Sequence, residues 1–227
     1  MSIIQITDLH KVYDETKVPV HALNGIDLTI NEGEFTAIVG PSGSGKTTLL
    51  NLIGGLDIPS RGQVNINGTN ISKLKSGKLI DFRLHNIGFV FQAYNLIPVL
   101  TAIENVAFIM QLQGQSKDKR HRRALELLEA VGIADKADQR PGNLSGGQQQ
   151  RVAVARALAS EPKFILADEP TANLDSKSTS ELLDMMQKMN RESNMTFLFS
   201  THDNRVVEKA RRIITIEDGK VASDVSN

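Results

Sequence analysis

The first chemically informative segment is a glycine-rich loop, Gly40-Pro41-Ser42-Gly43-Ser44-Gly45-Lys46-Thr47. It matches the pattern GxxxxGK[ST] in full, follows an apolar run at 35–39 and precedes a helix-compatible stretch, which is the context that this pattern requires. Glycines let the backbone aim N–H groups at phosphate oxygens, and the helix adds the positive end of its dipole. Lys46 supplies a charge for the β and γ phosphates, and the Thr47 hydroxyl can ligate Mg²⁺. We therefore predict a nucleotide-phosphate cradle here.

Two carboxylates that could serve phosphate chemistry follow another apolar run. Residues 164–167 are apolar, and Asp168 and Glu169 come next. A buried strand would carry Asp168 to its C-terminal end, where open α/β sheets bind ligands, so Asp168 could hold a metal ion. Glu169 lies one residue further and could orient or deprotonate an attacking water. The alternative is a strand that ends in an acidic turn, and the presence of the phosphate loop favours the chemical interpretation.

The segments that must position these residues include several short β-rich runs. We predict them at residues 3–7, 26–30, 35–39, 63–66, 87–91, 164–167, 196–200 and 213–216. The runs 35–39, 164–167 and 196–199 are nearly continuous apolar, which indicates central strands of a largely parallel sheet. The more alternating early runs suit an antiparallel layer. The pattern predicts an α/β fold.

Helical patterns lie between these strands. From about 92 to 160 no strand signal appears, and we predict a mostly helical insertion within one domain that spans residues 1–227. Ser145-x-x-Gln148 and Ser178-x-x-Glu181 both match a capping box, and each is expected to open a helix. Residues after about Asp218 are expected to form a short tail.

The segment Leu144-Ser145-Gly146-Gly147-Gln148 points to a family. Taken alone, a serine and two glycines that open a helix are either an anion site or an ordinary capped helix start. The segment lies between the phosphate loop and Asp168, and no Asn-Lys-x-Asp motif of a GTPase is present. In this setting it resembles the signature of the ABC ATPases. The resemblance covers nearly the whole chain and implies their fold: a P-loop core of largely parallel sheet, an antiparallel β layer and an inserted helical subdomain.

The resemblance also implies roles for single residues. The catalytic residues would be Glu169 as general base, with His202, Gln92 and Lys46. The ATP-binding residues in the same chain would be Tyr13, which resembles the adenine-stacking aromatic residue, then Gly40, Pro41, Ser42, Gly43, Ser44, Gly45, Lys46, Thr47 and Thr48. The Mg²⁺ site would use Thr47, Gln92 and Asp168. In a head-to-tail dimer, Ser145, Gly146, Gly147 and Gln148 would serve the partner's ATP, and Asp175 would lie at the dimer interface.

Some of these residues have simpler interpretations. Tyr13 could be a plain strand-edge tyrosine, and a single histidine such as His202 is more often structural. The basic run 117–123 is most simply a solvated helix start, although contact with lipid headgroups or a permease is the alternative. The apolar cluster 96–100 is a partner site if it is exposed and core if it is buried.

The composition limits the partners. The formal net charge is zero, so no long-range field attracts the chain to nucleic acid, and we expect no nucleic-acid partner. The chain has no cysteine, which excludes disulfides, a thiol nucleophile and a cysteine-ligated metal. No signal peptide or bilayer-spanning run is visible, so any membrane contact is expected to go through a partner.

Three stretches, 52–57, 140–148 and 167–175, resemble the branch of the family that serves macrolide export, lipoprotein release and related FtsX-like permeases. Ala172 departs from the glycine that is usual there. The resemblance implies an ATP- and Mg²⁺-dependent subunit at the cytoplasmic face of the membrane, held there by a permease. The alternatives are the ATPase of a regulatory complex of the cell-division type, or that of an amino-acid or ion importer.

Overall fold

The computed structural model describes residues 1–14 and 18–226. Its centre is a six-stranded sheet in the order β10-β9-β3-β8-β7-β6. Strands β3, β6, β7, β8 and β9 pair in parallel, and β10 pairs antiparallel with β9. The bounds of these strands are β3 Phe35–Val39, β6 Ile87–Val90, β7 Phe164–Asp168, β8 Thr196–Ser200, β9 Arg212–Glu217 and β10 Lys220–Ser226.

The central strands β3, β7 and β8 are nearly continuous in apolar residues because both faces of the sheet are covered. Successive side chains of a strand point to opposite faces. In β8, Phe197 and Phe199 join one hydrophobic cluster with helices α3 to α6, whereas Leu198 joins a second cluster with helix α1 and the antiparallel strands. The prediction of central, doubly buried strands is therefore confirmed.

The second sheet is antiparallel, in the order β2-β1-β4-β5. Its strands are β1 Ser2–Tyr13, β2 Val20–Asn31, β4 Arg61–Ile66 and β5 Thr69–Asn70. Alternate side chains along β2, such as Ile26, Leu28 and Ile30, are buried. This period of two matches a sheet with one covered face and confirms the predicted antiparallel layer.

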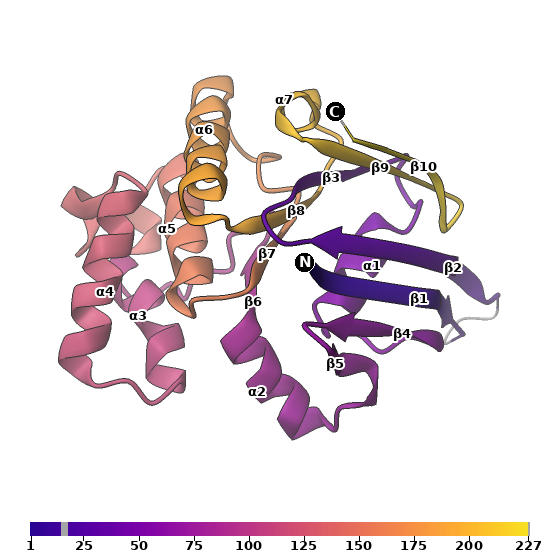
Figure 1. The fold of residues 1–227 in the computed structure, drawn as a ribbon. Helices are drawn as coiled ribbons and strands as arrows, with labels where there is room; N and C mark the ends of the chain where they lie inside the picture. The colour runs from indigo at the N-terminus through magenta and orange to yellow at the C-terminus, as the bar shows by residue number, and fades with distance from the viewer. Residues whose placement is uncertain (15–17, 227) are drawn as a thin grey trace.

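The helices surround the two sheets. They are α1 Lys46–Ile53, α2 Ser76–Asn86, α3 Ala102–Leu112, α4 Lys117–Ala130, α5 Gly146–Ala159, α6 Ser176–Ser193 and α7 Asn204–Lys209, with short 3-10 turns at Ile71–Lys73, Ala134–Lys136 and Pro141–Asn143. Figure 1 shows α3, α4 and α5 gathered on one side of the parallel strands and the antiparallel sheet on the other. Residues 92–160 contain helices and turns and no strand.

Two local expectations were wrong, and one helix was missed. The residues after Asp218 are not a tail, because Lys220–Ser226 pairs with β9 as an edge strand. The helix α2 was not predicted. The helix α6 begins at Ser176, so Ser178 lies in its first turn, and the cap is Asp175, whose carboxylate accepts a hydrogen bond from the Ser178 N–H at 2.9 Å.

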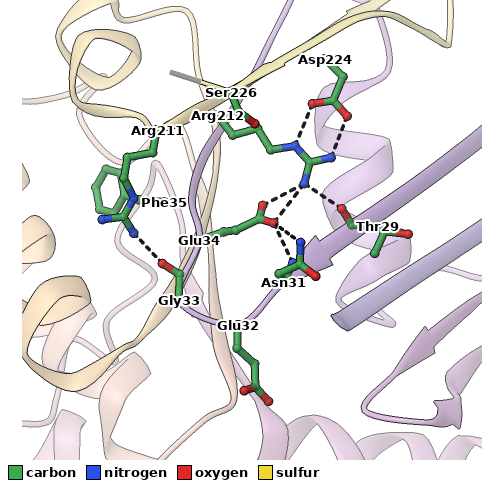
Figure 2. A pocket seen from close by; sticks show the side chains of 10 residues that line it. All are labelled: Thr29, Asn31, Glu32, Gly33, Glu34, Phe35, Arg211, Arg212, Asp224 and Ser226. Atoms are coloured by element: carbon green, nitrogen blue, oxygen red, sulfur yellow. Dashed lines mark hydrogen bonds and ion pairs between the residues drawn. The ribbon is translucent and has the colours of Figure 1, made fainter. Parts of the chain in front are cut away.

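The C-terminal hairpin is fastened to the core by Arg212 (Figure 2). Its guanidinium donates hydrogen bonds to both carboxylate oxygens of Asp224 at 2.7 Å, to Glu34 at 2.9 Å and to the Thr29 carbonyl at 2.8 Å. These residues line a hollow of about 590 Å³ beside the turn between β2 and β3. The hydrogen bonds from Arg212 lower the pKa of Asp224 even though partial burial acts to raise it.

We expect Arg212→Met to lower the free energy of unfolding by roughly 2–4 kcal/mol, because two partly buried carboxylates lose their partner. For Asp224→Asn we expect a smaller loss that depends on pH. Because folding lowers the pKa of Asp224 below its ordinary value of 3.8, its contribution is complete above that value and disappears as the pH falls through the lowered pKa. Urea unfolding from pH 3 to pH 7 measures both effects, and an equal loss for Asp224→Asn at every pH would contradict the assignment.

Candidate functional site

The phosphate loop connects the end of β3 to the start of α1. Gly40 and Gly45 have φ values of 146° and 105°, which side chains with a Cβ rarely adopt. A Cβ at Gly40 would lie 2.0 Å from the Ile216 carbonyl oxygen, and one at Gly45 would lie 2.4 Å from that of Ala22. The loop thus packs too closely against β9 and β2 for any other residue at these positions.

The Lys46 ammonium is held inside the loop. It donates hydrogen bonds to the carbonyl oxygens of Gly40 and Pro41 at 2.8 and 2.9 Å, and the residue is only 9% exposed. This arrangement places a positive charge beside the backbone N–H groups at the helix start. An anion with several oxygens is the ligand that such an arrangement suits.

Asp168 and Thr47 meet at the edge of the parallel sheet. The Thr47 hydroxyl donates a hydrogen bond to Asp168 Oδ1 at 3.2 Å, from the first turn of α1 to the last residue of β7. A hydroxyl and a carboxylate oxygen are hard donors of the kind that Mg²⁺ prefers, and Mg²⁺ in such sites takes its remaining ligands from phosphates and water. The donor set therefore fits the predicted cation.

Glu169 has a strained backbone and a partnered carboxylate. Its φ is 47°, and its N–H donates a hydrogen bond to the Ser200 carbonyl oxygen at 2.8 Å. His202 Nδ1 lies 2.7 Å from Oε1, and the Thr201 hydroxyl donates to Oε2 at 3.4 Å. The Glu169 side chain is 17% exposed and that of His202 is 75% exposed. Backbone strain of this kind is typical of functional sites, where the surrounding structure holds the residue in place.

A cavity of about 630 Å³ lies at the N-terminus of α1, and the phosphate loop, Glu169 and His202 line it. Of the predicted ATP-binding and catalytic residues, the cavity brings together Tyr13, Gly40, Ser42, Gly43, Gly45, Lys46, Thr47, Thr48, Gln92, Glu169 and His202. Pro41 and Ser44 belong to the loop but do not line the cavity, and Asp168 does not line it either but accepts a hydrogen bond from Thr47, which does. Val20, His21 and Ala22 also line it, and sequence reasoning missed them because their only signal is the pairing of β2 with the end of β1.

The signature segment, residues 144–148, lies outside this cavity. Ser145 and Gln148 form the predicted capping box of α5, with the Gln148 N–H donating to Ser145 Oγ at 3.3 Å and the Ser145 N–H donating to Gln148 Oε1 at 2.9 Å. A Cβ at Gly147 would lie 2.8 Å from Ser178 Oγ. The segment leaves Ser145 exposed at a helix N-terminus, where an anion is favoured.

Residues 92–95, here called the Gln92 segment, connect the cavity to α5 and to Asn173, two residues before the cap of α6. The Asn173 side-chain amide donates to the Gln92 carbonyl at 2.9 Å. Tyr94 and Asn95 both have positive φ, and Arg156 of α5 donates to both of their carbonyls, at 2.8 Å to that of Tyr94. Burial lowers the pKa of Arg156. Sequence reasoning missed Arg156, which has no local motif beyond its helix.

The fold and this cavity define a P-loop nucleoside-triphosphatase. The family model of the ABC transporters matches residues 23–172, and the chain belongs to that family as one of its ATP-binding, ATP-hydrolysing subunits. Among residues 1–14 and 18–226, no helix combines the length and the apolar character needed to cross a membrane.

Several known proteins align with nearly the whole of this chain. The lipoprotein-releasing system ATP-binding protein LolD 1 of Rhodopseudomonas palustris is 46% identical, over 97% of this chain and 98% of its own length. The macrolide export ATP-binding/permease protein MacB of Hyphomonas neptunium is 45% identical over 99% of this chain, which spans only 35% of that protein. A solved dimer of the ATP-binding cassette MJ0796, in a post-hydrolysis state with ADP and Pi, superposes with a TM-score of 0.92 at 42% identity, covering 99% of this chain and 98% of that one.

Proposed function

We propose that ATP is hydrolysed in the 630 Å³ cavity, with its triphosphate on the phosphate loop and its base against Tyr13. The observation that carries this proposal is the convergence of four residues from three separate segments on one cavity: Lys46 and Thr47 at the start of α1, Glu169 after β7 and His202 after β8. Thr47 and Asp168 would hold Mg²⁺ with the phosphates, assisted by Gln92. The ion would neutralise the charge that develops on the phosphates.

Glu169 acts as the general base in this proposal. Its carboxylate takes a proton from water as the water oxygen attacks the γ-phosphorus. The bond between the γ-phosphorus and the bridging oxygen breaks, and ADP and phosphate leave. His202 lies 2.7 Å from Glu169, so it can fix the carboxylate, and its exposed ring can reach the γ-phosphate. Lys46 stabilises the negative charge of the β and γ phosphates.

The signature segment completes the site of a second copy. Ser145 is the exposed N-cap of α5 and does not line the cavity of its own chain, so a nucleotide that it contacts would lie in the cavity of another copy. A head-to-tail pair with two-fold symmetry would set each signature segment against the partner's ATP. The similarity to the MJ0796 dimer supports this arrangement. Asp175 would lie near that interface, although its carboxylate also caps α6 and accepts from the Ser178 hydroxyl at 2.7 Å.

An apolar groove is suited to a membrane partner. It has a volume of about 670 Å³ and is lined from α2, β6, α3 and α5, with Ile80, Phe89, Phe108 and Leu112 among its residues. Ile80 and Leu112 are 57% and 55% exposed. Asn95 and Arg156 also line it, so the groove adjoins the Gln92 segment. We propose that an FtsX-like permease docks here, at the cytoplasmic face of the membrane, and that the complex drives export or lipoprotein release. The similarity to MacB and LolD 1 supports that branch over an importer or a regulatory complex.

Replacing an exposed groove residue tests the docking. We expect Ile80→Asp to abolish co-purification with the permease. Basal ATP hydrolysis should stay within about twofold of that of the unaltered chain, because Ile80 is exposed and is not part of the hydrophobic core. Leu96, in the apolar cluster 96–100, packs against the core, so replacing it would disturb folding as well as docking. Val225→Asp is the matched control, since Val225 is 52% exposed on β10, away from the groove. Detergent pull-down with mass spectrometry measures the outcome, and a many-helix permease with a soluble binding protein would identify an importer instead.

A further inference from the structure

A cluster of three polar side chains lies at the edge of the nucleotide cavity, where β1 ends. The Tyr13 hydroxyl donates a hydrogen bond to Asp57 Oδ2 at 2.9 Å, and the Lys11 ammonium donates to Asp57 Oδ1 at 2.6 Å. Lys11 also donates to the Ile58 carbonyl at 2.9 Å. Tyr13 is thereby joined through one carboxylate to the Lys11 ammonium group.

Lys11 also covers one face of the tyrosine ring. Its nitrogen lies over the ring, 4.8 Å from the centroid, within the range of a cation–π contact. The Lys11 side chain is only 12% exposed. With one face occupied by the lysine and the ring lining the cavity, the opposite face is the surface on which a flat ligand can stack.

The ionisation states keep this contact intact at neutral pH. Burial and the hydrogen bond to Asp57 raise the pKa of Tyr13, so the phenol stays protonated. Burial also acts to raise the pKa of Asp57, but hydrogen bonds from Lys11, the Ile58 N–H and Tyr13 outweigh it, and the pKa of Asp57 is lowered. The phenol therefore donates to a carboxylate that is charged.

Asp57 belongs to the segment that ends the phosphate-loop helix. The Leu56 N–H donates to the Asn51 carbonyl of α1 at 2.8 Å, and Asp57 Oδ1 accepts from the Ile58 N–H at 2.7 Å. The same helix begins at Lys46. The Asp57 carboxylate thus fixes the Tyr13 ring relative to helix α1, whose first residues belong to the phosphate loop.

We propose that Asp57 and Lys11 are positioning residues that hold the Tyr13 ring in place to stack on the base of ATP. This inference rests on the proposed role of Tyr13 and extends it to two residues that do not line the nucleotide cavity. A ring fixed before binding loses no freedom when the base arrives, so the pair should increase affinity for the base and leave the phosphates and the chemical step unaffected.

Two ligands separate the base from the phosphates: Mg-ATP and magnesium tripolyphosphate, which has no base. We expect Asp57→Asn and Lys11→Met each to raise the Kd of ATP by roughly threefold to tenfold, the cost of ordering one freed side chain when the base binds. The Kd of tripolyphosphate and the kcat at saturating ATP should stay within a factor of about two, because the cradle is unchanged. Asp184→Asn is the matched control, since Asp184 forms an ion pair of 2.6 Å with Lys209 away from the cavity. Isothermal titration measures both constants.

Tyrosine fluorescence reports the contact directly. The chain has no tryptophan and two tyrosines, so Tyr94→Phe leaves Tyr13 as the sole tyrosine. A phenol hydrogen-bonded to a carboxylate is quenched, and we expect adding Asp57→Asn to increase its emission before ATP is bound. A folding defect alone would instead change the unfolding midpoint and the binding of both ligands. Unchanged emission would overturn the inference.

The remaining outcomes separate this inference from the function on which it rests. Tyr13→Ala should raise the Kd of ATP by roughly fivefold to a hundredfold, the range of one base–aromatic stack. If Tyr13→Ala weakens ATP while Asp57→Asn and Lys11→Met do not, the positioning role is wrong and the stacking role stands. If Tyr13→Ala has no effect, the stacking role is wrong as well. Equal weakening of ATP and tripolyphosphate by Asp57→Asn would also overturn the inference.

Discussion

Glu169→Gln should lower the kcat for ATP hydrolysis by roughly a hundredfold to ten thousandfold, the contribution of a general base. The amide has nearly the same shape as the carboxylate, so it can keep the contacts with His202 and Thr201. It cannot accept the proton of the attacking water. The Kd of ATP should stay close to that of the unaltered chain, because the phosphate loop is intact.

Steady-state phosphate release and equilibrium ATP binding measure these two quantities separately. Glu129→Gln is the matched control, because Glu129 is exposed on α4, away from the cavity. It should change neither quantity by more than about twofold. Activity of Glu169→Gln near that of the unaltered chain would contradict the role of Glu169, and joint loss of binding and turnover would indicate damage to the loop instead.

Lys46→Ala should weaken ATP binding itself. The substitution removes a positive charge from a site that is 9% exposed and built to face phosphates. Each charged hydrogen bond that is lost is worth roughly 1.5–3 kcal/mol, so the Kd of ATP should rise by about tenfold or more and turnover should be lost with it. Equilibrium binding of ATP by titration calorimetry measures the first effect.

Lys119→Ala serves as the comparison for Lys46→Ala, because Lys119 is exposed on α4 within the basic run 117–123. It should bind ATP as the unaltered chain does. An unchanged Kd for Lys46→Ala would show that the triphosphate lies elsewhere. The contrast between Glu169 and Lys46 is therefore the decisive pattern: one variant keeps the ligand and loses the reaction, and the other loses both.

Much of the site could be predicted from the sequence because its signals are local. Fewer than ten consecutive residues contain each of three signals: the phosphate loop, the carboxylates after residue 167 and the capping box at Ser145. The structure places each signal on the expected element. The rule that open α/β sheets bind ligands at the carboxyl ends of their strands predicted Asp168 at a strand end, whereas its place beside Thr47 was implied only by the family resemblance. The doubly buried strands were visible because burial on both faces needs continuous apolar residues.

The remaining features depend on contacts that no local pattern encodes. The edge strand β10 has one partly buried residue among exposed ones, so it lacks a periodic apolar face and is held by pairing with β9. Helix α2 has no fully buried residue and hence no strong helical period. Ser178 and Asp175 both suit a helix start, and only the backbone shows which one caps α6. The contact between Tyr13 and Asp57 joins residues 44 positions apart.

The central claim is that each ATP is enclosed by the phosphate loop of one copy and the signature segment of another. The most direct measurement is the mass in solution of Glu169→Gln with Mg-ATP, beside Glu169→Gln with Ser145→Asp. Aspartate caps a helix as well as serine does, so α5 should be preserved while the new charge repels the partner's triphosphate. We predict that the mass of Glu169→Gln doubles from 24.9 kDa on addition of Mg-ATP and that the double variant remains a monomer. A Glu169→Gln chain that binds ATP and stays monomeric, or a double variant that dimerises equally well, would contradict the claim.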